Sequence, residues 1–261
     1  MPDATDKPQP TIRLTNVHKR FGRLVVLDGV SLDVNEGETL VILGASGSGK
    51  SVMLKHIVGL LKPDAGEVFV HGERIDDKPE YYLMQMRRRF GFLFQMGALF
   101  DSLTNHENVA FPLVEHTSKS RQEIDDAVKR CLTLVGLPDV GLKMPGELSG
   151  GQRKRVALAR AIALEPECIL YDEPTTGLDP IRSDVINELV LKLQRELGIT
   201  SVVVTHDMNS AFKVGDRLVM LHHGKIIFDG TPDEARRSSD DTLRRFVAGE
   251  ASEEELGQLK L

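Results

Sequence analysis

The sequence predicts an α/β fold built around a phosphate-binding loop, with an antiparallel sheet before the loop and an inserted helical region after it. Residues 44–51 match the pattern G-x-x-x-x-G-K-[ST], which joins a buried strand to a helix in phosphate-binding proteins. Alternating apolar residues precede this loop, and helical periodicity extends over about residues 102–164. We interpret the helical region as an insertion between two halves of a nucleotide-binding core.

The composition limits the class of protein. The chain has 261 residues, of which 41% are hydrophobic and 28% charged, as in an ordinary globular protein with a sizeable core. Its formal net charge of −6 argues against nucleic acid as a main partner. With two cysteines and no apolar run near the roughly 18 residues of a membrane span, the pattern fits neither a disulfide scaffold nor an integral membrane protein. Residues 1–10 lack the apolar segment of a secretory signal, so we expect a disordered lead and a cytoplasmic protein.

Three short strands are predicted before the loop, over residues 11–17, 25–27 and 30–34, where apolar and polar residues alternate. Phe21 lies in the turn after the first of them and is the only aromatic residue ahead of the loop. Its ring has two interpretations, which are a platform that stacks on a nucleotide base and a core residue at a turn.

The phosphate-binding loop follows a buried strand over residues 39–43 and leads into a helix predicted over residues 51–59. Glycines let its backbone fold tightly, so that consecutive N–H groups point at a phosphate. Lys50 would carry positive charge to the β- and γ-phosphates, and the Ser51 hydroxyl would hold Mg²⁺. The alternative, a glycine-rich turn that matches by accident, is disfavoured by the strand–loop–helix context. The candidate nucleotide-binding residues are Gly44, Ala45, Ser46, Gly47, Ser48, Gly49, Lys50 and Ser51.

A buried strand predicted over residues 90–94 ends at Gln95. Ligands gather at the carboxyl ends of strands in an open α/β sheet, so Gln95 is a candidate to contact Mg²⁺ or the attacking water. The alternative is an amide that satisfies backbone groups at the strand end. The apolar segment over residues 96–100 is unusual for a loop, and either packs into the core or forms an exposed surface for a partner.

Two further strands end in titratable side chains. Asp172 is expected to hold Mg²⁺ through Ser51 or a water molecule, and Glu173 to polarise the attacking water as a general base. His206 also follows a strand, where we expect it to contact the γ-phosphate. The alternatives are a surface turn with the sequence Asp-Glu-Pro and a structural histidine. These two strands are predicted over residues 168–173 and 200–204.

The helical region contains two helix starts. Ser120 and Glu123 form the pattern of a capping box ahead of an apolar helical face, which residues 136–138 end. Residues 148–152, Leu-Ser-Gly-Gly-Gln, lead into a second helix with Ser149 as the expected N-cap. A serine and two glycines at a helix N-terminus form an anion site, whereas the alternative is an ordinary capped helix.

The C-terminal part is expected to complete the domain. Asp179 is the predicted N-cap of a helix whose first residue is Pro180. A hairpin is predicted over residues 217–228 and helical structure over residues 232–248. The acidic tail from Gly249 is either a weak helix that needs a partner or a disordered segment.

These features, in this order, resemble the ATP-binding subunit of ABC transporters, whose signature is Leu-Ser-Gly-Gly-Gln. The resemblance covers residues 11–249 and implies a RecA-like P-loop core, an antiparallel β subdomain and an inserted α-helical subdomain over about residues 96–164, followed by a tail over residues 250–261. It implies ATP and Mg²⁺ as cofactors. Many members of the family have tyrosine where this chain has Phe21, a change that keeps stacking and removes a hydroxyl contact.

The resemblance also implies a dimer of identical subunits. Each ATP would lie between the phosphate-binding loop of one subunit and the signature of the other, and Asp179 would lie in the loop that crosses the interface. Lys50, His206 and Gln95 would act with Glu173 in hydrolysis. The second subunit would contribute Ser149, Gly150, Gly151 and Gln152. The Mg²⁺ ligands would be Ser51, Gln95 and Asp172.

A finer similarity concerns residues 91–100, 108–113 and 245–249, which look like those of the Mla-type phospholipid transport ATPases. This similarity implies an ATPase at the cytoplasmic face of the inner membrane that powers a permease and moves phospholipid across or between envelope membranes. Further partners would be a small STAS-type protein and an MCE-type lipid-binding protein. ATPase subunits of amino-acid or other small-solute importers share the same layout and remain an alternative at this point.

Other classes of function explain less of the sequence. A non-transport ABC ATPase would carry long heptad runs or a second cassette, and a small-molecule kinase would leave residues 148–152 unexplained. A regulatory cassette that binds ATP without hydrolysis would lack Glu173 or Lys50, and both are present.

Overall fold

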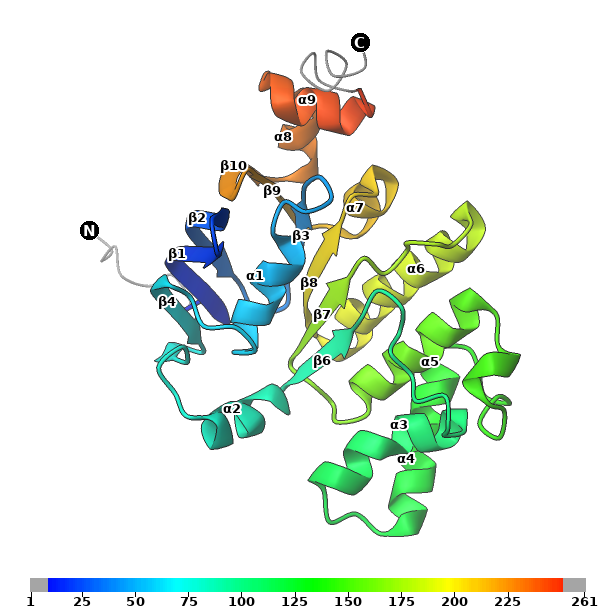
Figure 1. The fold of residues 1–261 in the computed structure, drawn as a ribbon. Helices are drawn as coiled ribbons and strands as arrows, with labels where there is room; N and C mark the ends of the chain where they lie inside the picture. The colour runs from blue at the N-terminus through cyan, green and yellow to red at the C-terminus, as the bar shows by residue number, and fades with distance from the viewer. Residues whose placement is uncertain (1–8, 251–261) are drawn as a thin grey trace, which may run out of the picture.

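The computed structural model describes residues 9–250, which form two sheets and a group of helices (Figure 1). The predicted lead over residues 1–10 and the predicted tail over residues 250–261 lie almost wholly outside the described residues. None of the described helices is long and apolar enough to cross a bilayer.

The larger sheet has six strands in the order β10-β9-β3-β8-β7-β6, and all neighbours except β10 and β9 run parallel. Strand β8 consists largely of β-branched residues and is buried along its whole length, as in a sheet covered on both faces. The carboxyl ends of β3, β8 and β7 are adjacent, because Leu43 pairs with Thr205 and Asp172 with Val204. The strands are β3 (Thr39–Leu43), β6 (Phe90–Leu93), β7 (Cys168–Asp172), β8 (Thr200–Thr205), β9 (Arg217–His222) and β10 (Lys225–Gly230).

The smaller sheet is antiparallel, in the order β2-β1-β4-β5. The prediction of separate strands over residues 25–27 and 30–34 is wrong, because one strand, β2, spans both. Gly29 lies within it at a φ of +76°, and bulges in the pairing with β1 carry the strand across this point. The strands are β1 (Ile12–Phe21), β2 (Leu24–Val34), β4 (Ala65–Val70) and β5 (Glu73–Arg74).

The helices cover both faces of the six-stranded sheet (Figure 1). The capping box predicted at Ser120 is present, and Asp179 caps a helix that begins at Pro180, as predicted. The single helical stretch predicted over residues 232–248 is two helices, since Asp240 caps a new helix start. The described helices are α1 (Lys50–Ile57), α2 (Glu80–Arg87), α3 (Asn105–His116), α4 (Arg121–Leu134), η1 (Pro145–Glu147), α5 (Gly150–Ile162), α6 (Pro180–Leu197), α7 (Met208–Val214), α8 (Pro232–Arg237) and α9 (Asp241–Ala248).

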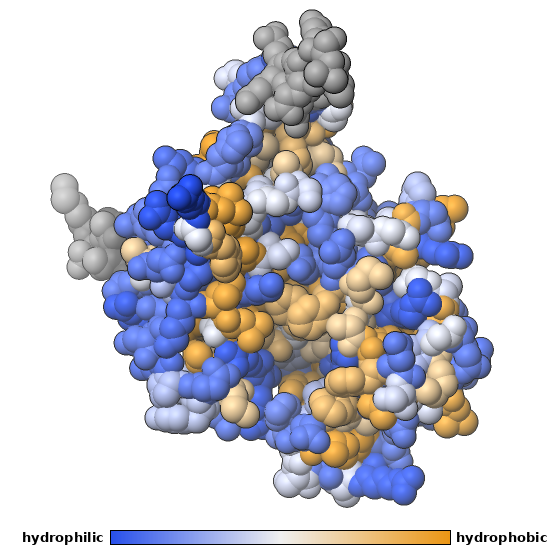
Figure 2. All heavy atoms as spheres, in the orientation of Figure 1, coloured by the Kyte–Doolittle hydropathy of each residue, from blue (hydrophilic) through white to orange (hydrophobic). Residues whose placement is uncertain are grey.

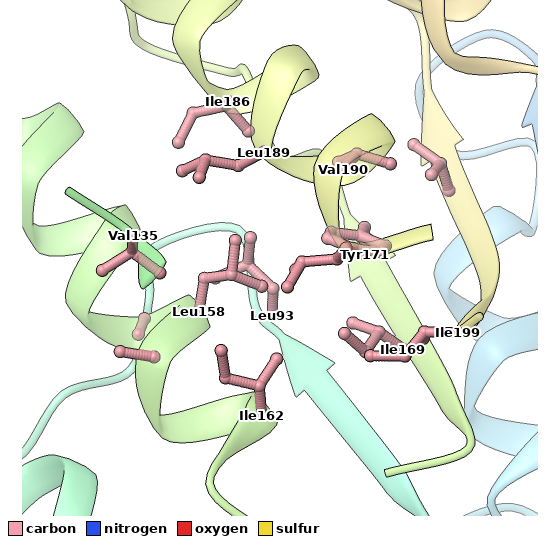
Figure 3. Close-up of a cluster of buried hydrophobic side chains, with 14 of the residues drawn as sticks. Leu93, Val135, Leu158, Ile162, Ile169, Tyr171, Ile186, Leu189, Val190 and Ile199 are labelled. Atoms are coloured by element: carbon pink, nitrogen blue, oxygen red, sulfur yellow. The ribbon is translucent and has the colours of Figure 1, made fainter. Parts of the chain in front are cut away.

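Two hydrophobic clusters hold these layers together. In the first, α1 packs between the two sheets through Met53, Leu54 and Ile57. In the second, Leu158 of α5 and Val190 of α6 pack on the opposite face of the six-stranded sheet with Tyr171 (Figure 3). Burial of apolar surface stabilises these contacts by about 25 cal/mol per Å² and holds both α1 and α5 against the sheet. The two helices that begin at glycine-rich segments are thus held on a common frame.

Candidate active site

The phosphate-binding loop has a backbone that only glycine tolerates at two points. A Cβ at Gly44 would lie 2.4 Å from the Leu221 carbonyl oxygen, and one at Gly49 would lie 2.9 Å from the Val26 carbonyl oxygen. Gly49 is the N-cap of α1 in a left-handed conformation, and no side chain caps the helix. The first N–H groups of α1 therefore remain available as donors to an anion.

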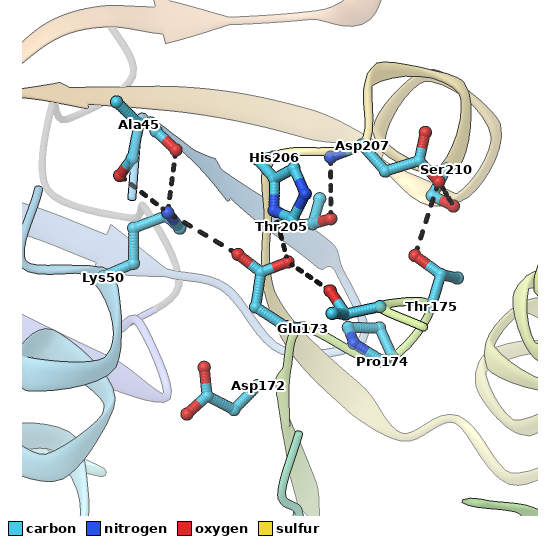
Figure 4. Close-up of polar contacts among 12 residues, drawn as sticks. Ala45, Lys50, Asp172, Glu173, Pro174, Thr175, Thr205, His206, Asp207 and Ser210 are labelled. Atoms are coloured by element: carbon cyan, nitrogen blue, oxygen red, sulfur yellow. Dashed lines mark hydrogen bonds and ion pairs between the residues drawn. The ribbon is translucent and has the colours of Figure 1, made fainter. Parts of the chain in front are cut away.

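Lys50 is buried at the start of α1, with a relative exposure of 6%. Its Nζ donates to the carbonyl oxygens of Gly44 at 2.7 Å and Ala45 at 3.0 Å, and lies 3.6 Å from Glu173 Oε1 (Figure 4). Burial lowers the pKa of Lys50, and the Glu173 carboxylate opposes part of that effect. The ammonium is thus held between the loop and the end of β7.

Ser51 at the start of α1 contacts Asp172 at the end of β7, where the Ser51 hydroxyl donates to Asp172 Oδ1 at 2.8 Å. Burial raises the pKa of Asp172, and this hydrogen bond opposes the rise. A hydroxyl and a carboxylate are oxygen ligands of the kind that Mg²⁺ prefers together with phosphate oxygens. Among residues 9–250 no group of three or more His, Cys, Asp or Glu side chains could hold a metal ion. The oxygen donors of Ser51 and Asp172 fit the coordination of Mg²⁺ by a nucleotide's phosphates and a few protein groups.

Glu173 stands between Lys50 and His206 (Figure 4). Its Oε2 lies 2.8 Å from His206 Nδ1 and accepts a hydrogen bond from Thr176 Oγ1 at 3.2 Å. The Glu173 side chain is 13% exposed, whereas that of His206 is 59% exposed. The Glu173 backbone has a φ of +51°, a left-handed conformation that residues other than glycine rarely adopt. A carboxylate in this position can accept a proton from a water molecule near the phosphate loop.

Gln95 and Phe21, two of the predicted site residues, lie outside this group of polar contacts. Gln95 is exposed in the turn that follows β6, and its side chain has no hydrogen bond partner among the described residues. Phe21 ends β1 with 47% of its surface exposed, and the Lys19 ammonium lies 5.7 Å from its ring centroid. The ring is thus open on the surface of the antiparallel sheet rather than packed in a core.

The Leu-Ser-Gly-Gly-Gln segment forms the start of α5, with Ser149 as the N-cap, as predicted. Gln152 N donates to Ser149 Oγ at 3.3 Å, and Ser149 N donates to Gln152 Oε1 at 2.9 Å. Within the part of the chain that the structure describes, no hydrogen bond or ion pair joins residues 149–152 to residues 44–51. One chain therefore presents these two segments separately.

Sequence reasoning missed Lys154, although it is as buried as Lys50. Its Nζ donates to the backbone carbonyls of Glu173, Pro174 and Thr176, so the helix that begins at the signature contacts the loop after β7. Its place in a run of three basic residues is typical of a solvated helix face, so the sequence carries no signal of its burial.

A second missed group lies behind His206. The buried Ser210 hydroxyl donates to Asp207 Oδ2 at 2.5 Å and accepts from Asn187 Nδ2 at 2.9 Å, while Thr175 Oγ1 lies 3.4 Å from the same carboxylate oxygen. These polar contacts tie α6 and α7 to the two loops that carry Glu173 and His206. Buried polar groups that satisfy one another in this way hold a single arrangement.

Comparison with known proteins decides the family. A family model described as "ABC transporter" matches residues 27–176. The chain belongs to the ABC transporter family. It is an ATPase of that family, and the predicted family and fold are confirmed.

Curated relatives match most of this ABC ATPase. The "Probable ribonucleotide transport ATP-binding protein mkl" of Mycobacterium leprae is 42% identical over 238 residues, which cover 91% of this chain and 69% of that protein. The "Intermembrane phospholipid transport system ATP-binding protein MlaF" of Haemophilus influenzae is 40% identical over 243 residues, which cover 93% of this chain and 92% of that protein. "Protein TRIGALACTOSYLDIACYLGLYCEROL 3, chloroplastic" of Arabidopsis thaliana is 40% identical and covers 91% of this chain and 73% of that protein.

A solved structure has the same fold. The ATP-binding cassette MJ0796, described as the dimeric structure of a post-hydrolysis state bound to ADP and Pi, superposes with a TM-score of 0.78. It is 39% identical, and the match covers 85% of this chain and 98% of that one.

Proposed function

We propose that this ABC ATPase is the ATP-hydrolysing subunit of a transporter that moves phospholipid across or between envelope membranes. The observation that carries the hydrolytic part is the position of the Glu173 carboxylate, between the Lys50 ammonium and the His206 ring and next to the Ser51–Asp172 pair. The cassette is assigned to residues 11–249, with its helical subdomain over about residues 96–164.

In this proposal each residue of the site has one task. The uncapped start of α1 and Lys50 bind the β- and γ-phosphates, and Ser51 and Asp172 hold Mg²⁺, which would neutralise phosphate charge. Glu173 accepts a proton from the attacking water, and His206 stabilises the charge on the γ-phosphate. Gln95 is exposed in the turn after β6, so the contact with Mg²⁺ or water that we assign to it requires movement of that turn.

The signature supplies the other half of the site in a second copy of the chain. The separation of residues 149–152 from residues 44–51 in one chain supports this arrangement, as does the dimeric state described for the cassette MJ0796. Ser149, Gly150, Gly151 and Gln152 contact the partner's ATP, Asp179 crosses the interface, and Phe21 stacks on the adenine.

The permease contact is placed on the apolar surface that follows β6. Met96 is 85% exposed, and Phe94 and Phe100 are also exposed. The ring centroid of Phe100 lies 4.9 Å from that of Phe111, which is exposed too. Figure 2 shows apolar groups in the lower centre of the molecule, over the helices that follow β6. An apolar surface of this kind is suited to a helix of a membrane partner. We therefore propose that the protein acts at the cytoplasmic face of the inner membrane.

The relatives named for intermembrane phospholipid transport support the lipid cargo, whereas the mycobacterial relatives are named for ribonucleotide transport. A test is to purify the ATPase with the permease encoded beside its gene and to measure hydrolysis in vesicles. Stimulation by phospholipid, and not by amino acids or ribonucleotides, is the expected result. Stimulation by a small solute alone would overturn the assignment of phospholipid as the cargo. STAS-type and MCE-type proteins encoded beside the gene are the expected further partners.

The permease surface is tested by a charge at its most exposed residue. M96E is expected to release the ATPase from the permease during co-purification, because a buried carboxylate without a partner destabilises an apolar interface. The free energy of unfolding of the isolated chain should not change. M84E, at another exposed methionine on α2, is the matched control and should remain bound. Equal retention of both variants would contradict this placement.

A further inference from the structure

The loop that carries Glu173 is wrapped around one buried ammonium. Lys154 Nζ donates to Pro174 O at 2.7 Å and Thr176 O at 2.8 Å, and lies 3.3 Å from Glu173 O. An ammonium has three donors, so these carbonyl groups use all of them. Among residues 9–250 its hydrogen bond partners are these backbone carbonyl groups.

The loop wrapped around Lys154 includes a residue with an unfavourable backbone conformation. Glu173 has a φ of +51°, and a residue other than glycine stays in this conformation only when its surroundings hold it there. Thr176 N donates to Glu173 O at 3.3 Å and Glu173 N to Val204 O at 3.0 Å, and the Lys154 contacts add to these backbone bonds. Lys154 supplies three contacts to backbone carbonyls of the segment that carries the Glu173 side chain.

The cost of burying Lys154 shows that the contact is not incidental. Its side chain is 6% exposed, and burial lowers the pKa of its ammonium to about 8. The charged group that faces it is Glu173, which opposes part of this shift. Methionine or leucine would fill an apolar position on α5 without desolvating a charge. A lysine at this position is explained by the carbonyls that it binds.

We propose that Lys154 is a positioning residue for ATP hydrolysis, which holds the Glu173–Thr176 backbone so that the Glu173 carboxylate faces Lys50 and His206. The inference rests on the proposed role of Glu173. Lys154 would also link the two halves of the dimer. It lies one helical turn after Gly150, and Gly150 belongs to the segment that we assign to the partner's ATP. Movement of α5 on binding that ATP would act directly on the loop of Glu173.

The test compares K154M, K154R and K192M in the full chain. K154M removes every donor at similar length, and we expect kcat for ATP hydrolysis to fall about tenfold or more, a loss within the range of general-base catalysis. The affinity for MgATP should change less than twofold, because Lys154 contacts no phosphate-binding residue. K154R retains donors and charge and should recover most of the loss. K192M removes a lysine that donates to the Leu134 carbonyl and should keep wild-type turnover.

Each result decides the inference. Turnover of K154M at the wild-type rate, or a parallel loss of MgATP binding and kcat, would overturn it. Retained MgATP binding shows that a variant is folded, and if K154M does not fold, K154Q, which keeps an amide donor, is measured in the same way. E173Q separates the two proposals. If E173Q remains active, the role of Glu173 fails, whereas an inactive E173Q with an active K154M removes only the role of Lys154.

Discussion

The two glycine-containing helix starts of this ATPase, at α1 and at α5, differ in how their first N–H groups are satisfied. α1 begins after Gly49, and no side chain bonds to its first turn. α5 begins after Ser149, which exchanges two hydrogen bonds with Gln152. The first helix start is therefore open to an external anion in a single chain, whereas the second already satisfies some donors itself. The helix start that we propose contacts a partner's nucleotide is thus capped within its own chain.

The buried lysines of these helices show a related difference. Lys50 divides its contacts between two carbonyl groups and the Glu173 carboxylate, whereas Lys154 contacts carbonyl groups alone. The lysine of α1 therefore joins the phosphate-binding loop to a carboxylate, and the lysine of α5 holds the backbone of another loop. Both lysines meet at Glu173, Lys50 at its carboxylate and Lys154 at its carbonyl oxygen.

The largest effect is expected at that meeting point. E173Q should lower kcat about 10²–10⁴-fold, because the amide cannot accept a proton, while MgATP binding persists. Phosphate release and nucleotide binding measure the two effects separately. E165Q is a matched control, since Glu165 is exposed and has a similar left-handed backbone at a φ of +55°. Substantial turnover by E173Q would remove the basis of the comparison.

The contrast between the two lysines predicts a loss of affinity for one of them only. K50M should weaken MgATP binding by about tenfold to hundredfold, since a charge-assisted hydrogen bond contributes roughly 1.5–3 kcal/mol. K154M should bind with wild-type affinity. Equilibrium titration with a fluorescent ATP analogue measures both, and an equal loss in the two variants would show that Lys154 also serves the ligand.

The two serine caps of the helical region separate stability from function. Ser149 and Ser120 both form capping boxes, so S149A and S120A should each lower the free energy of unfolding by about 1 kcal/mol. Urea unfolding measures this effect. Only S149A should also reduce ATP turnover, because only this hydroxyl is assigned to the partner's nucleotide. If S120A reduces turnover equally, general destabilisation explains the loss.

The last prediction concerns how stability depends on pH. The pKa of Lys154 is about 8 in the folded chain, below its ordinary value of 10.5, so the unfolded chain binds more protons between these values. The contribution of Lys154 to stability therefore rises as pH increases through this window. The difference in free energy of unfolding between the wild type and K154M should shift in favour of the wild type from pH 7 to pH 10. A difference that is constant with pH would show an unperturbed lysine.

Local rules predicted much of the site. The positions of Lys50 and Ser149 follow from glycine and capping patterns within a few residues, and the strand ends bring Glu173 and His206 together as expected. Register and burial could not be predicted in this way. The continuity of β2 through Gly29 depends on pairing with β1, and Lys154 lies in a basic run whose burial is decided by a loop that follows it in sequence.

The exposure of Gln95 and the break at Asp240 have similar causes. Gln95 follows an edge strand, so its surroundings depend on how the next turn folds rather than on the strand itself. A helical pattern over residues 232–248 does not tell whether one helix or two is formed. The structure shows two, because the Asp240 side chain accepts a hydrogen bond from Leu243 N and caps a second helix. Tertiary context decided both outcomes.

The strand order also has a consequence for biosynthesis. The strand before the phosphate-binding loop pairs on one side with β8 and on the other with β9, both of which leave the ribosome long after the loop itself. Contacts between such distant segments form late, since loop closure precedes their stabilisation. A nascent chain that stops before residue 200 would contain the complete loop motif and neither of its neighbouring strands. Binding of nucleotide would therefore report that synthesis has passed β9 and that the sheet has closed.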